Sequence, residues 1–151
     1  MKSKAGFTLI ELMVVMAILG VMGATAVPLY RTYQQRAYGS QAALMAKQLI
    51  DAEIMYFLEH DKFFPEDPSI AFHIPADNPP SAEHSQMIQD IKNALNVTIT
   101  PGKVLTYQIN SGNDTAEDWC QVRIWATFPL FKDGRNDIVL HVTSDGRVVP
   151  F

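Results

Sequence analysis

The first hydrophobic segment of the chain is long and almost uninterrupted. Residues 7–27 read FTLIELMVVMAILGVMGATAV, and their one charge is Glu11. As an α-helix this run is about 32 Å long, enough to cross a hydrocarbon core of about 30 Å. Lys2 and Lys4 precede it. Because positive residues tend to stay in the cytoplasm, the sequence predicts a single-pass span with a large external part.

Residues 29–61 continue the helical signal with a different pattern. Apolar residues recur at steps of three and four positions, which predicts one wide apolar face on an otherwise polar helix. They are Ala42, Met45, Leu49, Ala52 and Tyr56 and, beside them, Ala43, Ala46, Ile50, Ile54 and Phe57. The two segments together predict one helix of about fifty residues. Its first half suits lipid, and its second half packs on another element.

The rest of the chain predicts a loop, a short helix and a sheet. The proline-rich stretch 65–80 predicts a loop, and residues 81–96 predict a helix with Ser81 as N-cap. Strand-like patterns follow, with a tight Asp-Gly hairpin, at 97–100, 105–109, 120–128, 138–142 and 144–149. We therefore predict an α+β fold in which an antiparallel sheet of three to five strands is covered by the amphipathic half of the long helix.

Composition narrows the classes of function. A length of 151 residues is typical of one globular domain. The formal net charge is -4 and the 12 Lys and Arg are scattered, which argues against a nucleic-acid partner. The four histidines show neither an HExxH pattern nor a pairing with cysteine typical of metal sites. Cys120 is the only cysteine, so no intrachain disulfide can form, and we expect it to be a small buried hydrophobe.

The stretch KAGFTLIEL at residues 4–12 resembles the class III signal sequence of type IV pilins and of the related type II secretion pseudopilins. A short basic leader ends in Gly6, Phe7 and TLIE follow, and an apolar span comes next. This resemblance implies cleavage by prepilin peptidase between Gly6 and Phe7, and methylation of the new amine of Phe7. It also implies that the apolar helix stays on the mature protein.

The resemblance extends along the helix. The segments YRTYQQRAYGSQA and YFLEHDKFFP resemble the pilin helix and the exit from it. Gly20 and Pro28 lie where the helix of the family is loosened or kinked, which implies a hinge. The expected organisation is a leader at residues 1–6, a transmembrane and filament-core helix at 7–28, and a globular pilin domain at 29–151. This domain is expected to consist of an amphipathic helix at 29–61, a loop with a short helix at 62–96, and an antiparallel sheet at 97–151.

The resemblance also offers a role for Glu11. A charge near the middle of a bilayer is costly, so a lone acid there needs a partner or a purpose. In a staggered filament the amine of Phe7 on one subunit can meet the Glu11 carboxylate of its neighbour. Glu11, with Thr8, is therefore assigned to assembly. An ordinary membrane anchor, whose acid snorkels or pairs with another membrane protein, is the alternative.

The expected function is that of a structural subunit and not of an enzyme. The resemblance implies a precursor in the inner membrane that polymerises into a filament at the cell surface, for adhesion, motility or related functions. Its implied partners are further copies of the chain, prepilin peptidase, an inner-membrane assembly platform and an assembly ATPase. A type II secretion pseudopilin is the alternative within the family. A secreted soluble domain cleaved after Ala26 is the alternative from another class, because ATA at 24–26 also fits a signal-peptide site.

A weaker signal lies near the C-terminus. The stretch FKDGRNDI places Asp133, Asn136 and Asp137 close together, with Asp145 in the next hairpin. Oxygen ligands at this density can bind calcium. A tight turn at Asp133-Gly134 is the favoured interpretation. We therefore expect no cofactor, with calcium as the alternative.

Overall fold

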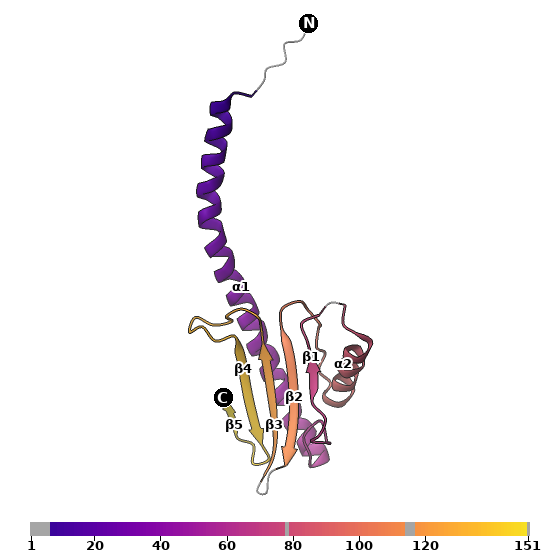
Figure 1. The fold of residues 1–151 in the computed structure, drawn as a ribbon. Coiled ribbons are helices and arrows are strands. Elements are labelled where there is room, and N and C mark those ends of the chain that lie inside the picture. The colour runs from indigo at the N-terminus through magenta and orange to yellow at the C-terminus, as the bar shows by residue number, and fades with distance from the viewer. Residues whose placement is uncertain (1–6, 78, 114–116, 151) are drawn as a thin grey trace. The chain divides into compact units, whose positions relative to one another are not determined.

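The computed structural model of the chain describes residues 7–77, 79–113 and 117–150 (Figure 1). Its elements are helix α1, strand β1, helix α2 and four further strands: α1 (Leu9–His60), β1 (Phe72–Ile74), α2 (Ala82–Leu95), β2 (Thr106–Asn113), β3 (Asp118–Trp125), β4 (Asp137–Thr143) and β5 (Val148–Pro150). This composition confirms the predicted α+β class. Contacts divide the chain between Gln34 and Gln35 into two compact units, which are described separately.

Helix α1 runs without interruption through 52 residues, as the sequence predicts. The first unit contains residues 9–34 of α1, which are apolar as far as Val27 apart from Glu11 and the small polar residue Thr25. In the second unit, residues 35–60 lie across one face of the sheet (Figure 1). Helix α2 also begins as predicted, because the Ser81 hydroxyl accepts a hydrogen bond from the His84 backbone at 3.1 Å. It ends where Asn96 takes a left-handed conformation at φ 54°.

The sheet is an antiparallel meander with the strand order β1-β2-β3-β4-β5. The register pairs Ile109 with Val122 and Val122 with Leu140, so apolar residues of successive strands share one face. The predicted hairpin joins β4 to β5, and Gly146 takes the positive φ of 81° that this turn requires. The turn predicted at Asp133-Gly134 is also present, with Gly134 at φ 88°.

Two local predictions differ from the structure. Residues 97–100 form no strand, although Ile99 is buried, because this segment leaves α2 without joining the ladder. Conversely, the proline-rich stretch contains β1, where Phe72 and Ile74 face the core and His73 faces solvent. A strand of three residues between prolines is too short for alternation to reveal it, and only its pairing with β2 defines it.

The core lies between the second half of α1 and the inner face of the sheet. Helix α1 supplies Ala42, Ala46, Leu49 and Ile50, and the strands supply Tyr107, Ile109, Cys120, Val122, Ile124 and Val142. Gly39 allows α1 to approach the loop after β3, because a Cβ there would lie 2.5 Å from the Leu130 carbonyl oxygen. The Gln35 amide donates to the Phe131 carbonyl at 2.7 Å in the same region. A close helix–loop contact thus fixes this end of the globular unit.

Candidate functional site

The N-terminal part of α1 presents an apolar surface that the chain itself leaves uncovered. Its large hydrophobic side chains are exposed on every side of the helix: Leu9, Ile10, Leu12, Met13, Val14, Val15, Met16, Ile18, Leu19, Val21, Met22 and Val27. An 18-residue window of this helix is long and apolar enough to cross a membrane, and none of it is buried. A surface of this size needs lipid or another apolar partner.

Glu11 closes the start of α1 by bonding to Thr8. The Thr8 backbone N–H and hydroxyl both donate to Oε2 of Glu11, at 2.8 and 2.7 Å. In return, the Glu11 backbone N–H donates to the Thr8 hydroxyl at 3.3 Å. This reciprocal arrangement is a capping box, which satisfies backbone donors that a helix start leaves unpaired. The Thr-x-x-Glu spacing is the sequence signal for this capping box, which was not predicted.

Phe7 and Glu11 lie at one shallow hollow on the same unit. It has a volume of about 370 Å³ and is lined by Phe7, Ile10, Glu11, Val14 and Val15. Phe7 itself is 79% exposed. The residues predicted for methylation and for assembly therefore stand together at the free end of the apolar helix. Gly6, the predicted cleavage residue, lies outside the described residues.

The predicted hinge residues both lie inside continuous α-helix. A Cβ on Gly20 would meet no atom within 4 Å. Pro28 interrupts no helical turn in the structure, and the Thr32 hydroxyl donates to its carbonyl at 3.0 Å. Proline within a helix removes one backbone hydrogen bond, so the position is locally weakened even where the helix continues. The hinge stays a prediction.

The residues predicted as alternative calcium ligands are engaged in other contacts. Asp133 pairs with Arg135 at 2.7 Å and Asp137 with Arg123 at 2.9 Å. Asp145 pairs with Arg147 and also accepts from the Thr143 hydroxyl. Asn136 donates to the Ala126 carbonyl at 3.1 Å. Within residues 7–77, 79–113 and 117–150, no group of three or more His, Cys, Asp or Glu side chains is placed to hold a metal ion.

Glu53, on the core-facing side of α1, is a buried acid that was not among the residues predicted from the sequence. Its side chain is fully buried, and Oε2 accepts a hydrogen bond from the Phe64 backbone N–H at 3.0 Å. The buried oxygen Oε1 has no hydrogen-bond partner among the described residues. Burial raises the pKa of Glu53 to about 8, against the opposing effect of the Phe64 hydrogen bond. The protonated form of Glu53 is therefore the dominant one at neutral pH.

Cys120 lies beside this acid, as a fully buried side chain on β3. Burial, and then the neighbouring Glu53, raise the pKa of the thiol well above its ordinary value. Its Sγ lies 4.0 Å from the Phe64 carbonyl, and the Ser111 hydroxyl donates to the Pro65 carbonyl. Side chains from α1, β2 and β3 thus hold residues 64–65 against the core. The predicted burial of Cys120 is confirmed.

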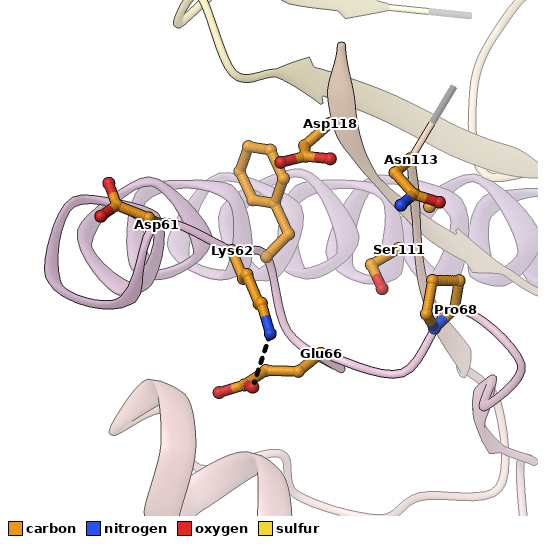
Figure 2. A pocket seen from close by; sticks show the side chains of 9 residues that line it. Asp61, Lys62, Glu66, Pro68, Ser111, Asn113 and Asp118 are labelled. Atoms are coloured by element: carbon orange, nitrogen blue, oxygen red, sulfur yellow. Dashed lines mark ion pairs between the residues drawn. The ribbon is translucent and has the colours of Figure 1, made fainter. Parts of the chain in front are cut away.

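A pocket of about 280 Å³ lies where α1 ends, between the segment after the helix and the turn-side ends of β2 and β3. Lys62 Nζ lies 3.6 Å from Oε2 of Glu66. Figure 2 shows the two side chains facing each other. Asp61, Asn113 and Asp118 also line the pocket. This ion pair is exposed, and exposed pairs contribute little to stability.

Comparisons with known proteins identify the motif at the N-terminus. Residues 1–27 match the family described as the prokaryotic N-terminal methylation motif. The chain therefore combines an N-terminal methylation motif with an apolar N-terminal helix and an α+β globular unit.

Individual relatives define the family. The chain is 33% identical over 121 residues to a type IV major pilin protein PilE1 of Neisseria gonorrhoeae, over 80% of this chain and 67% of that protein. It is 47% identical over 58 residues to a fimbrial protein of Neisseria meningitidis, over 38% of this chain and 34% of that protein. A third relative is the type IV major pilin protein PilA of Myxococcus xanthus, at 43% identity over 38% of this chain and 26% of that protein.

The chain belongs to the type IV pilin family. It spans no more than about two thirds of the length of the relatives named above. No solved structure gave a significant match.

Proposed function

We propose that this chain is a structural subunit of a type IV pilus. The observation that carries the proposal is an N-terminal methylation motif on an uncovered apolar helix that is joined to a separate globular unit. The helix supplies a surface that can associate with lipid in a precursor and with other apolar helices in a filament. The chain is then a building block, not a catalyst. It enters assembly as the substrate of a peptidase.

Processing after Gly6 is the first step of this proposal. Prepilin peptidase cuts between Gly6 and Phe7, and the amine of Phe7 is methylated. The matched motif supports this step, since it is a motif for N-terminal methylation. The precursor lies in the inner membrane, where an assembly platform and its ATPase drive polymerisation, and the mature chain lies at the cell surface.

The structure suggests how Glu11 can serve two roles. Both Thr8 donors bond to Oε2 of Glu11, so the cap uses one of the two carboxylate oxygens. A carboxylate accepts on both oxygens, which leaves Oε1 to receive the charged amine of Phe7 from a neighbouring subunit. The cap fixes the position of the carboxylate before the neighbour arrives. An ion pair in an apolar filament core then sets the register between subunits.

The mass of the mature chain tests the proposal. We expect filaments sheared from cells to contain this chain beginning at Phe7, with one methyl group on its amine. Intact-mass measurement and N-terminal sequencing of the filament protein provide the readout. A mature protein that starts at Val27 would instead identify a secreted domain cleaved after Ala26. Absence of the chain from any filament would contradict the subunit role.

A further inference from the structure

A groove on the outer face of the sheet adjoins the pocket at the end of α1. It has a volume of about 440 Å³, within the range of about 300–1,000 Å³ typical of small-molecule sites. Strand β2, Trp119 of the neighbouring strand β3 and the segment before β1 line it; besides Trp119 the lining residues are Gln108, Asn110, Ser111, Gly112, Asn113, Pro68, Ile70 and Ala71. Strands β1, β2 and β3 lie side by side there (Figure 1).

Trp119 is held in place at this groove. Its indole lies against the backbone of Gly112, where an added Cβ would come within 2.5 Å of the ring. Its ring centroid is 5.4 Å from that of His141, with the planes tilted by 30°. The side chain is half-buried and therefore keeps part of its ring available. A fixed, partly exposed indole offers an apolar stacking surface at little cost in conformational entropy.

Two amide side chains complement this apolar surface. The Gln108 amide donates to the Asn110 carbonyl oxygen at 3.4 Å, which aligns the two groups along β2. The pair carries four N–H donors and two carbonyl acceptors, of which this contact uses one each. Aligned amides of this kind suit adjacent hydroxyl groups, which both donate and accept.

The lack of charged residues in the lining limits the class of ligand that the groove can bind. None of its lining residues is ionisable, whereas the adjoining pocket contains Asp61, Lys62, Glu66 and Asp118. Nucleic acids and anionic headgroups are bound mainly through Lys and Arg, which this lining lacks. An uncharged molecule with one apolar face and many hydroxyl groups fits the lining better.

We propose that this groove binds an uncharged pyranose unit of a glycan, which stacks on Trp119 while its hydroxyl groups bond to Gln108 and Asn110. The proposal goes beyond the subunit role and does not depend on it. Each copy of the chain would carry one such site on its globular unit.

Calorimetric titration of the full chain tests the proposal. The protein is held in dodecylphosphocholine micelles, because a glycoside detergent would compete for the groove. The probes are the uncharged hexasaccharides cellohexaose, maltohexaose and fully acetylated chitohexaose. We expect at least one to bind, and Trp119→Ala to weaken it at least about tenfold, or about 1.4 kcal/mol. Trp119→Phe should restore much of the affinity.

Trp125→Ala is the matched control. Trp125 lies on the same strand and the same face, contacts His73 and Arg123, and does not line the groove. We expect this variant to bind like the wild type. If Trp119→Ala fails to fold, Asn110→Asp provides a second test, since it keeps the side-chain shape and adds a charge that should weaken binding.

Three outcomes would overturn the proposal. No hexasaccharide binds, or binding survives Trp119→Ala, or hexathymidylate binds more tightly than any saccharide. Filament counts distinguish this failure from that of the subunit role, because Trp119→Ala should leave filaments intact. Loss of filaments in that variant would show that the groove is a contact between subunits.

Discussion

Two glutamates on one helix show how differently the two regions of this protein treat a carboxylate among apolar side chains. Glu11 lies on the uncovered half of α1, where its oxygen bonds to Thr8 in the same turn. Glu53 lies on the covered half, fully buried, with one oxygen bonded to the Phe64 backbone. In our proposal the first acid keeps an oxygen for an external partner, whereas the second is enclosed by its own chain.

Whether the rest of the chain buries a glutamate decides the charge state of its carboxyl group. Burial raises the pKa of Glu53 to about 8, so its neutral form is stable inside the globular unit. Glu11 has no such cover within its own chain, and in our proposal it meets a positive amine from a neighbour. Glu53 is neutralised by a proton, whereas in our proposal the charge of Glu11 is neutralised by the amine of a neighbouring subunit. Variants that remove each charge separately should therefore affect different properties of the protein.

The largest expected effect concerns Glu11→Gln. Glutamine keeps the length and the acceptor oxygen and can still close the capping box, but it cannot pair as a charge. We expect processing to continue and filaments to fall by on the order of a hundredfold or more, because the amine of Phe7 is left buried without a counter-charge. Electron-microscopic counts and immunoblots of the mature chain provide the readout. Wild-type filament numbers in this variant would contradict the ion-pair role.

The second prediction concerns Glu53 and pH. An unfolded Glu titrates near 4.5 and the folded one near 8, so between these values the unfolded chain has lost a proton that the folded chain keeps. The free energy of unfolding should therefore fall as pH rises through this window, by about 1.4 kcal/mol per pH unit, and on the order of 5 kcal/mol in total. Below 4.5 the contribution is fully present.

Glu53→Gln isolates this contribution. Glutamine has nearly the same shape, still accepts from Phe64, and does not titrate. Denaturant unfolding of the full chain in micelles, followed by tryptophan fluorescence at several pH values, gives the difference between wild type and variant. That difference should change steadily between pH 4.5 and 8. A difference that is independent of pH would show that Glu53 is not the titrating group.

The third prediction concerns the contact of α1 with the loop after β3. In Gly39→Ala the added Cβ would lie 2.5 Å from the Leu130 carbonyl oxygen, so helix or loop must shift. We expect the globular unit to lose about 1–3 kcal/mol of stability, as for other overpacked contacts. Gly23→Ala is the matched control on the same helix, because a Cβ there meets nothing within 4 Å. Equal stability of the two variants would contradict the close contact.

Much of this architecture could be predicted from the sequence, because its signals are long and periodic. Alternation predicted β2, β3 and β4, and the apolar steps predicted the face of α1 that carries Leu49 and Ile50. The β1 strand could not be predicted, since three residues between prolines carry no period of their own. Its existence depends on pairing with β2.

The two glutamates show the same limit at the level of sites. Glu11 was identified by the motif around it, but its bond to Thr8 was missed, although the Thr-x-x-Glu spacing is a known helix-start signal. Glu53 stands in register with the buried positions Ala46, Leu49 and Ile50. An acid in that register is a signal for a buried carboxyl group. Its partner, the Phe64 backbone, could not be predicted because the path of the chain after α1 has no periodic pattern.

The smallest expected effect separates the two roles of Glu11. Thr8→Val removes the hydroxyl of the capping box and keeps the side-chain shape and the charge of Glu11. Loss of an N-cap costs about 0.5–2 kcal/mol, and this affects only the first turn of α1. We therefore expect filament numbers within about twofold of wild type, with faster amide exchange confined to residues 9–12 in micelles. If Thr8→Val and Glu11→Gln reduce filaments equally, assembly requires the cap as much as the charge, because the valine variant keeps the carboxylate and the glutamine variant keeps the cap.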